Sequence, residues 1–347
     1  MQDSATMNTA LLSGLRVLDL SIWRPGPYAT SLLVALGADV LKVEPPDGDP
    51  MRHYAGLFES INAGKRSIEL DLKDGDDRDR ALALAMEADV LVEGFRPGVM
   101  ARLGMDTATV RGANPALVYC SISGYGQDDP RAELPGHDVN YQAWAGALTP
   151  EGGTARISPL PIADLAGGMA AAFGICAAVL GRNATGEGTY LDVSMTDVLA
   201  TWTGRIGSDD GDSDSGASRS GPVPGYGIFE TADGGQVALG VISEQHFWSN
   251  LCLELGLDDL APLTFADRSA RGPEMQRVVT EAIAGRCRDE LVAALTAVNV
   301  PVAPVLDRQG MVASAPFRPF PIRLALPEVT AAAPALDQHR GEGFPKR

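Results

Sequence analysis

The sequence predicts an α/β protein, in which a Rossmann-like, doubly wound parallel sheet is followed by a smaller α+β domain. Three observations predict this fold class. Short runs rich in β-branched residues alternate with helical stretches through the first half of the chain. A segment of Gly, Ser, Asp and Pro then interrupts the alternation, and a hairpin pattern with amphipathic helices follows it. With 347 residues, the chain is long enough for two domains that each bury a core.

The large domain is expected to contain strands joined by helices. Its strands are predicted at Leu15–Leu20, Val40–Glu44, Ser67–Leu72, Asp89–Glu93, Leu117–Ile122 and Thr189–Met195. Its helices are predicted at Pro27–Leu36, Arg78–Glu87, Leu165–Gly181 and from Thr196 onward. Helices of this length between strands favour parallel pairing, with helices on both faces of the sheet. The large domain therefore spans residues 10–205, and the Pro-rich tail at 319–347 is expected to pack back on it and complete it.

The second domain follows a change of composition. Residues 206–225 are almost all Gly, Ser, Asp and Pro, which is typical of a flexible, solvated linker. Residues 226–312 then form the small α+β domain. Its hairpin is predicted from two alternating segments, Tyr226–Thr231 and Gln236–Val241, around a turn at Asp233-Gly234. Its helices are predicted at Glu244–Leu255, Pro273–Ala284 and Asp289–Ala297.

Charge and composition exclude several classes of function. The chain has 28 Lys and Arg against 45 Asp and Glu, and its net charge of −17 repels polyphosphates. No basic run is long enough to reverse this field over a nucleic-acid footprint, so no nucleic-acid partner is expected. The first residues do not resemble an export signal, and the apolar run Leu165–Gly181 is too short for a membrane span, so no membrane partner is expected. Four scattered cysteines without a C-x-x-C pair fit reduced thiols, and we expect a cytoplasmic protein.

Familiar cofactor and metal signatures are missing from the sequence. No G-x-G-x-x-G follows the first predicted strand, so NAD is not implied. The segment Gly64–Ser67 lacks the earlier glycine and the Ser or Thr that a phosphate-binding loop places after its lysine, so ATP is not implied. Asp210, Asp212 and Asp214 alternate like a calcium loop, but the glycine comes late and the final glutamate is missing. We expect no metal and no tightly bound cofactor.

Two residues are candidates for acid–base or nucleophilic chemistry. His137 follows Pro135-Gly136 in a turn after a predicted strand, where parallel sheets bind their ligands. A helix N-cap or a structural turn residue is an equally good interpretation of His137. Asp164 stands at the start of the Ala-rich helix, where it serves as N-cap or lies beside backbone N–H groups that hold a developing oxyanion. The glycines at 167 and 168 indicate that a bulky group approaches this helix closely.

Several motifs follow one another in a fixed order along the chain. They are LSGLRVLDL (12–20), LGADVLKVEP (36–45), GDPMR (48–52), NAGKRSIELDLK (62–73), EGFRPGVMARL (93–103), NPALVYCSISGYGQ (114–127), GHDVNY (136–141), ADLAGG (163–168) and GEGTYLDVSM (186–195). This set resembles the family III CoA-transferase superfamily (CaiB/BaiF type), which contains formyl-CoA and carnitine CoA-transferases and the α-methylacyl-CoA racemases. The resemblance covers nearly the whole chain and extends through PVAPVL (301–306) and APALDQH (333–339).

The resemblance implies an interlocked homodimer in which each chain's two domains are threaded through the partner. It also implies that CoA binds the large domain as part of an acyl-CoA substrate, with the active site facing the partner's small domain. The cations that the matching motifs place near the CoA phosphates and adenine are Lys42, Lys65, Arg66, Arg96 and Arg102. Local cations would have to pair with phosphate oxygens in so acidic a protein, although an ordinary surface cation is the alternative for any one of them.

The resemblance leaves two activities to choose between. In transferases of this superfamily, the aspartate at the position of Asp164 is a nucleophile that attacks the thioester. In racemases it shares α-proton transfer with a histidine of a His-Asp motif, which His137 in GHDVNY matches. We therefore expect an α-methylacyl-CoA racemase that works through an enolate, with Asp164, His137 and the small-domain carboxylate Glu244 at its active site. The alternative is CoA transfer between carboxylic acids through an anhydride at Asp164.

Two departures from the family patterns bear on this choice. Glu244 is slightly displaced from the racemase pattern, which keeps open a catalytically silent CoA-binding homologue. The run of glycines typical of formyl-CoA transferases is replaced by GPVPGYG at 221–227, which counts against a formyl-type transferase. The sequence does not disclose the acyl group. Aromatic residues such as Trp23 and Tyr141 are candidates for an acyl pocket, with core packing as the alternative.

Overall fold

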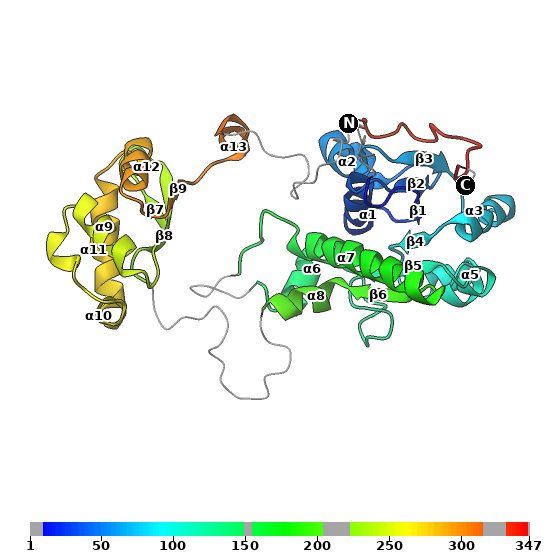
Figure 1. The fold of residues 1–347 in the computed structure, drawn as a ribbon, viewed down its shortest axis with the longest axis horizontal. Helices are drawn as coiled ribbons and strands as arrows, with labels where there is room; N and C mark the ends of the chain where they lie inside the picture. Colours follow the sequence, from blue (N-terminus) through cyan, green and yellow to red (C-terminus); the bar gives the residue numbers. More distant parts are fainter. Residues whose placement is uncertain (1–9, 149–154, 204–222, 315–330, 346–347) are drawn as a thin grey trace, which may run out of the picture. The chain divides into compact units, whose positions relative to one another are not determined.

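The chain forms two compact units in a computed structural model that describes residues 10–148, 155–203, 223–314 and 331–345. The large unit comprises Met1–Ser208 and Pro319–Arg347, so both ends of the chain belong to it (Figure 1). The small unit comprises Asp209–Arg318. Of the predicted linker at 206–225, only the last residues, 223–225, lie within the described part of the chain.

A six-stranded parallel sheet forms the centre of the large unit, in the order β3-β2-β1-β4-β5-β6. Its strands are β1 (Arg16–Asp19), β2 (Asp39–Glu44), β3 (Arg66–Glu69), β4 (Val90–Glu93), β5 (Val118–Ser123) and β6 (Tyr190–Ser194). The strand order runs outward from β1 and from β4, so the predicted doubly wound α/β fold is confirmed. At this reversal, Val17 pairs with Val40 on one side and with Val90 on the other.

Helices cover both faces of the sheet (Figure 1). The helices of the large unit are α1 (Pro25–Ala35), α2 (Ala55–Asn62), α3 (Gly75–Glu87), α4 (Val99–Arg102), α5 (Thr107–Ala113), α6 (Asp138–Trp144), α7 (Ile162–Thr185) and α8 (Met195–Trp202), with a 3-10 turn η1 (Pro50–His53). Neighbouring residues of a strand point to opposite faces, so Val17 is buried with α1 and α7, and Leu18 is buried with α3. The short helices α2, α4, α5 and α6 are not predicted from the sequence, because short helices depend on tertiary packing more than on their own periodicity.

The long helix α7 is buried on one side only. Gly167 and Gly168 lie on the buried side, and a Cβ at Gly168 would lie 2.6 Å from the carbonyl oxygen of Pro25 in α1. A Cβ at Gly167 would lie 2.5 Å from Cγ of Met195 in α8. The close approach that these glycines predict is therefore made by neighbouring helices within the chain.

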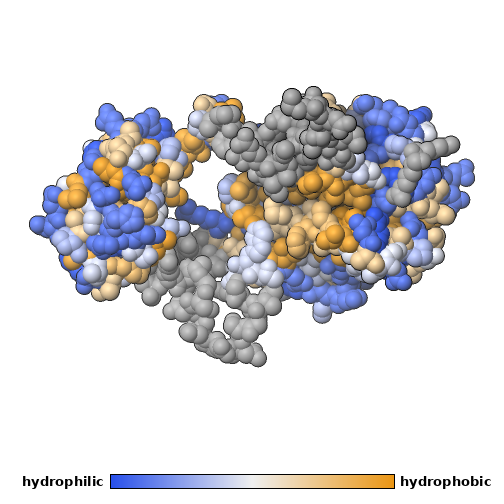
Figure 2. Space-filling model, in the orientation of Figure 1, coloured by the Kyte–Doolittle hydropathy of each residue, from blue (hydrophilic) through white to orange (hydrophobic). Residues whose placement is uncertain are grey.

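The other side of α7 exposes large apolar residues. Met169, Phe173 and Leu180 are exposed, and hydrophobic residues gather over this part of the large unit (Figure 2). By length and composition α7 would suffice to cross a membrane, yet 44% of its apolar window is buried inside the chain. The expectation of a buried core helix thus holds for one side of α7, and a contiguous apolar surface on the other side requires its own explanation.

The C-terminal segment 331–345 packs against the outer strand β3 of the large unit. The backbone N–H of His339 donates to the carbonyl of Ser67 (2.9 Å), and Nδ1 of His339 accepts from the N–H of Ser67 (3.1 Å). Asp337 accepts from the N–H of Glu69 (3.0 Å), and the ring of Phe344 is buried beside α3. This segment covers part of a strand edge that would otherwise expose unpaired backbone groups.

The small unit is an α+β fold around a three-stranded antiparallel sheet in the order β7-β8-β9. Its elements are β7 (Tyr226–Glu230), β8 (Gln236–Gly240), α9 (Gln245–Glu254), η2 (Asp258–Leu260), α10 (Phe265–Ala270), α11 (Gly272–Ala284), α12 (Arg288–Ala297), β9 (Val302–Pro304) and α13 (Arg308–Ser314). The predicted hairpin forms, and Gly234 adopts a φ of +76° in its turn, a conformation that suits glycine. Trp248, Val279 and Leu291 form part of the core of this unit.

Candidate active site

The candidate site lies at the carboxyl ends of β1 and β4, where the strand order reverses. Open α/β sheets bind their ligands at this point. The segment after β1 carries Trp23 and Arg24, and the segment after β4 carries Arg96. The two segments are adjacent, because a Cβ at Gly94 would lie 3.5 Å from the Cβ of Ser21. The first turns of α7 reach the same place through their contact with Pro25.

Asp138, the first residue of α6, caps the N-terminus of α7. Its Oδ1 accepts from the backbone N–H groups of Ala163 (2.8 Å) and Asp164 (3.2 Å), and its Oδ2 contacts the side-chain amide of Gln142. These N–H groups have no partner inside their own helix, so an acidic cap stabilises α7. The expected N-cap role of Asp164 is wrong, since the N-cap position is Pro161 and Asp164 lies inside the first turn.

The same contacts correct the expected oxyanion site at the start of α7. An enolate held there would need free backbone N–H groups. Those of Ala163 and Asp164 donate to Asp138, and that of Leu165 donates to the carbonyl of Pro161 (3.1 Å). Side chains around α7 are therefore better placed than these backbone groups to stabilise negative charge on a substrate.

The Asp164 carboxyl group has a perturbed acidity. Burial raises its pKa to about 7, the negative charge of Asp138 adds to this rise, and the nearby Arg24 guanidinium opposes it. Among the residues described, none donates a hydrogen bond to the Asp164 carboxyl oxygens. A half-buried carboxyl with this acidity and no hydrogen-bonding partner is a candidate nucleophile or base.

His137 occupies the N-cap position of α6 and is exposed. Its backbone N–H donates to Oδ1 of Asn140 (3.0 Å), which orders the turn that the sequence predicts here. The imidazole packs edge-on against the indole of Trp23, with 6.2 Å between the ring centroids. Because Asp138 follows directly and binds the N–H of Asp164, the 137–138 segment lies against the first turn of α7. His137 is both an N-cap residue and a neighbour of the site.

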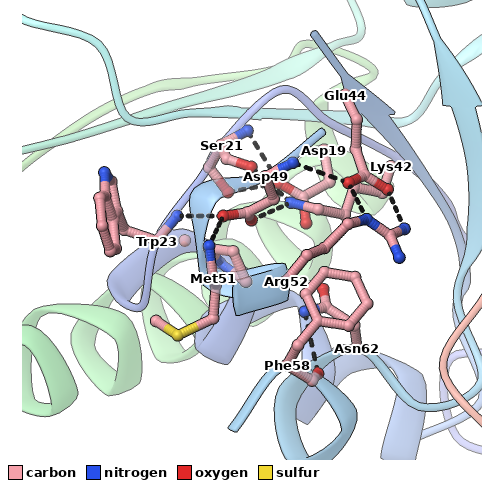
Figure 3. A network of polar contacts seen from close by, with 12 residues as sticks. Asp19, Ser21, Trp23, Lys42, Glu44, Asp49, Met51, Arg52, Phe58 and Asn62 are labelled. Atoms are coloured by element: carbon pink, nitrogen blue, oxygen red, sulfur yellow. Dashed lines mark hydrogen bonds and ion pairs between the residues drawn. The ribbon is translucent and has the colours of Figure 1, made fainter. Parts of the chain in front are cut away.

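Lys42 and Lys65 are buried in ionic contacts behind the site, and Figure 3 shows those of Lys42. Nζ of Lys42 lies 2.9 Å from Oδ2 of Asp49 and donates to the carbonyl of Ser21 (2.7 Å). Nζ of Lys65 lies 3.3 Å from Oδ2 of Asp19 and donates to the carbonyl of Pro27 (2.9 Å). Burial lowers the pKa of Lys65 to about 8, against the opposing attraction of Asp19.

This placement indicates that the two lysines have a structural role. Lys42 donates to the carbonyl of Ser21 in the segment after β1, and Lys65 donates to the carbonyl of Pro27 in the first turn of α1, so the two ammonium groups position this part of the backbone. Their contact with CoA stays a prediction, and it would require phosphates to reach ammonium groups that the described fold encloses. Local sequence patterns do not reveal this burial, because it depends on which distant segments enclose each lysine.

The three arginines expected near CoA are placed differently from the lysines and from one another. Arg66 forms a two-point ion pair with Asp39 (2.8 and 3.0 Å) and donates to the carbonyl of Gly343. Arg96 and Arg102 are exposed on the segment that follows β4. These two have no ion-pair partner among the described residues, so they are accessible to an anionic ligand. Their role toward CoA stays a prediction.

Glu244 lies in the small unit, at the N-cap position of α9. It is exposed, and Oε2 accepts from the backbone N–H of Ile242 (3.3 Å). Backbone hydrogen bonds from its own segment lower the pKa of this carboxyl, which keeps it ionised near neutral pH. An approach of Glu244 to Asp164 stays a prediction, because the two residues belong to different units.

Two residues of the site are absent from the sequence-based candidates. Arg24 immediately precedes α1 and influences the Asp164 carboxyl. Glu93, the last residue of β4, is buried, and burial raises its pKa to about 7. The signal that could have identified them is their position at the sheet reversal, with Glu93 at the end of β4 and Arg24 in the segment between β1 and α1. The three aspartates considered for calcium, at 210, 212 and 214, lie outside the described residues, and no group of three potential metal ligands occurs within them.

A half-buried carboxyl near the switch point of a doubly wound sheet is typical of the class of α/β enzymes that bind their substrates at this edge of the sheet. The chain matches CoA-transferase family III over residues 12–337, and it belongs to that family. It is therefore an enzyme of the family III CoA-transferase superfamily, and the family implies acyl-CoA substrates. This confirms the resemblance at the level of the family.

Individual relatives refine the comparison. The chain is 34% identical to the succinyl-CoA:mesaconate CoA-transferase of Haloarcula hispanica, over 95% of each protein. It is 33% identical to the alpha-methylacyl-CoA racemase of Homo sapiens, over 87% of this chain and 82% of the racemase. Other similar proteins are named as CoA-transferases of oxalate and glutarate. The crystal structure of a CaiB/BaiF family protein from Brucella suis superposes with a TM-score of 0.82 at 28% identity, covering 96% of this chain and 97% of that one.

Proposed function

We propose that this protein is a CoA-transferase that moves CoA between carboxylic acids, with Asp164 as its nucleophile. The observation that supports this most is the Asp164 carboxyl itself, half-buried in the first turn of α7 with no hydrogen-bond donor on its oxygens among the described residues. Similarity to several CoA-transferases and to one racemase favours this alternative over the racemase expected from His137. The proposed reaction needs CoA only as part of the substrate, and a cytoplasmic location remains part of the proposal.

The transfer proceeds through covalent exchange at Asp164. A carboxylate oxygen of Asp164 attacks the thioester carbonyl, the C–S bond breaks, and an anhydride and CoA thiolate form. The thiolate attacks the aspartyl carbonyl of the anhydride, which releases the donor acid as a carboxylate and leaves Asp164 as a CoA thioester. The acceptor carboxylate then attacks that thioester to give a second anhydride and the thiolate. Attack of the thiolate on the acceptor's acyl carbonyl yields the new acyl-CoA and regenerates the Asp164 carboxylate.

Trapping the covalent intermediate tests the nucleophile. Incubation with an acyl-CoA followed by hydroxylamine is expected to convert Asp164 into a hydroxamate that peptide mass spectrometry locates. Asp164→Asn should show neither this product nor transfer of CoA to an added acid. Transfer that persists in the Asn variant would contradict the proposal.

A racemase is the second candidate, and the exposed imidazole of His137 next to the Asp138 cap favours it. Its signature is incorporation of deuterium from heavy water at the α-carbon of a 2-methylacyl-CoA in the absence of an acceptor acid. The transferase predicts no such incorporation, together with CoA exchange that requires the acceptor. A chain that gives neither signal would be the catalytically silent CoA-binding homologue.

We further propose that the chain acts as the homodimer that the family resemblance implies. The exposed side of α7, with Met169, Phe173 and Leu180, supports this proposal. An apolar surface of this kind on one helix is stabilised by burial against a partner, and a second copy of the chain is the partner we propose.

A further inference from the structure

Arg24 carries a positive charge near the proposed nucleophile, and the proposed chemistry does not use this charge. It stands at the N-cap position of α1, whose first residue, Pro25, contacts α7 at Gly168, one turn after Asp164. The two side chains do not form an ion pair in this structure. Because the Arg24 charge still acts on Asp164, the guanidinium lies near the carboxyl without neutralising it.

The backbone on both sides of Arg24 is held by buried charged groups. Nζ of Lys42 holds the carbonyl of Ser21 (2.7 Å), and Oδ1 of Asp49 holds the N–H of Trp23 (3.1 Å), as Figure 3 shows. On the other side, Nζ of Lys65 holds the carbonyl of Pro27 (2.9 Å). Arg24 is therefore presented by an anchored segment, which distinguishes it from an ordinary mobile surface arginine.

The conformation of Trp23 points to a functional segment. Its φ is +65°, which L residues with large side chains rarely adopt. Such backbone conformations persist where surrounding contacts enforce them, and they concentrate at ligand sites. Here Trp23 is held by the hydrogen bond that its backbone N–H donates to Asp49 and by the packing of its indole against His137, and Arg24 follows it directly.

The ligand of Arg24 follows from charge and spacing. No described residue supplies a carboxylate to this guanidinium, while Asp138 and Asp164 make its surroundings acidic. An acyl group bonded to Asp164 would have to extend away from that carboxyl to reach Arg24. A short chain that ends in a second carboxylate satisfies both conditions, because a guanidinium binds carboxylates with paired hydrogen bonds.

We propose that Arg24 binds the distal carboxylate of the transferred acid, so that the substrates of this enzyme are short dicarboxylic acids and their CoA thioesters. This inference rests on the proposed transferase function and names its substrate class. Arg24 thereby becomes a specificity-determining residue. Without it, a dianionic acid would approach a protein of net charge −17 against local repulsion.

Two acids with four carbons, succinate and butyrate, provide the test, since they differ by one carboxylate. As CoA acceptors for the wild-type enzyme, succinate is expected to exceed butyrate in kcat/KM by about 100-fold. Arg24→Gln should remove most of this preference: the values for both acids fall with the ionised fraction of Asp164, and the value for succinate falls much further than the value for butyrate. Arg24→Lys should restore part of it. Arg277→Gln, which removes an exposed arginine from α11, is the matched control and should behave as the wild type.

Binding of the free acids, measured by calorimetry on the same variants, separates this inference from the transferase proposal. Binding of succinate that depends on Arg24, without any CoA exchange, would support the carboxylate site and overturn the transferase. Exchange that uses both acids equally, or an equal loss for both acids in Arg24→Gln, would overturn the carboxylate site and leave the transferase intact. If succinate does not bind and no CoA exchange occurs, both the carboxylate site and the transferase proposal are overturned.

Discussion

At Asp164, one carboxyl group lies between opposing electrostatic influences. Burial and the charge of Asp138 raise its pKa to about 7, and Arg24 acts against them. The groups that face it come from two places: Asp138 and Tyr141 from α6, and Arg24 from the segment before α1. The pKa of Tyr141 is itself raised in part by Asp164. A nucleophile must be ionised to attack, so the rate of transfer should depend on this balance.

The pH dependence of anhydride formation should therefore report on the neighbours of Asp164. We expect the single-turnover rate of hydroxamate formation to rise through about pH 7 as Asp164 ionises. Asp138→Asn removes a like charge and should move the midpoint to lower pH. Arg24→Gln removes an opposite charge and should move it to higher pH. A midpoint that stays in place in both variants would show that another group controls the profile.

Ionisation of Asp164 also costs folding stability. Its pKa is about 7 in the folded chain and 3.8 without the fold, so the folded state holds the proton more tightly. The folding stability that comes from this tighter proton binding is therefore lost as the pH rises from about 4 to about 7. Asp164→Asn should be more stable than the wild type at pH 8 by about 1–2 kcal/mol, a value reduced for partial exposure, and equally stable at pH 4. Urea denaturation at both pH values measures the difference, and an equal effect at pH 4 and 8 would refute this account.

At the scale of elements, the packing of α7 on α1 depends on the absence of a side chain at Gly168. A Cβ there would lie 2.6 Å from a backbone oxygen of Pro25, which cannot move without displacing α1. We expect Gly168→Ala to destabilise the chain by about 2–3 kcal/mol and to lower activity, because α1 follows Arg24. Gly181→Ala in the same helix is the matched control.

Gly181 has no atom within 4 Å of a built Cβ, so alanine there should stabilise α7 by about 0.5–1 kcal/mol. Thermal unfolding of both variants gives the comparison. If both substitutions stabilised the chain, or both destabilised it, close helix packing would not explain why residue 168 is a glycine.

In the small unit, Arg268 joins two segments near Glu244. Its guanidinium is fully buried, lies 4.8 Å from the centre of the Trp248 ring, and donates to the carbonyls of Pro224 and Ile242. Arg268→Met keeps most of the side-chain volume but leaves two carbonyls without this donor. It should cost about 2–4 kcal/mol of stability in urea, whereas Arg277→Met on the surface should cost less than about 0.5 kcal/mol.

At the scale of the whole molecule, the exposed side of α7 should control the oligomeric state. Phe173 is 77% exposed in the single chain, and a glutamate in its place would put a charge into the proposed dimer contact. Light scattering should give the mass of a dimer for the wild type and of a monomer for Phe173→Glu. Met86→Glu changes an exposed methionine on α3 and should remain dimeric. A monomeric wild type would contradict the proposed assembly.

Much of the fold was predictable because its signals are local. Each predicted strand of the large unit overlaps a strand of the sheet, from β1 at Arg16–Asp19 to β6 at Tyr190–Ser194. The sequence signal for the hairpin turn at Gly234 was equally local. The short helix α6 was not predicted, because its first residue, Asp138, is ordered by contacts with α7 and its own sequence begins like a turn.

The alternation of strands and helices, the family, and Asp164 as a candidate residue could all be predicted from the sequence, because these depend on residue types at short or fixed spacings. The tertiary fold was needed to show that Asp138 caps α7 from 25 residues away, and that Lys65 pairs with Asp19 across 46 residues and is buried. It also placed Arg24 where its charge acts on Asp164. Burial and electrostatic neighbourhood depend on which distant segments meet, and no periodicity within one segment encodes that meeting.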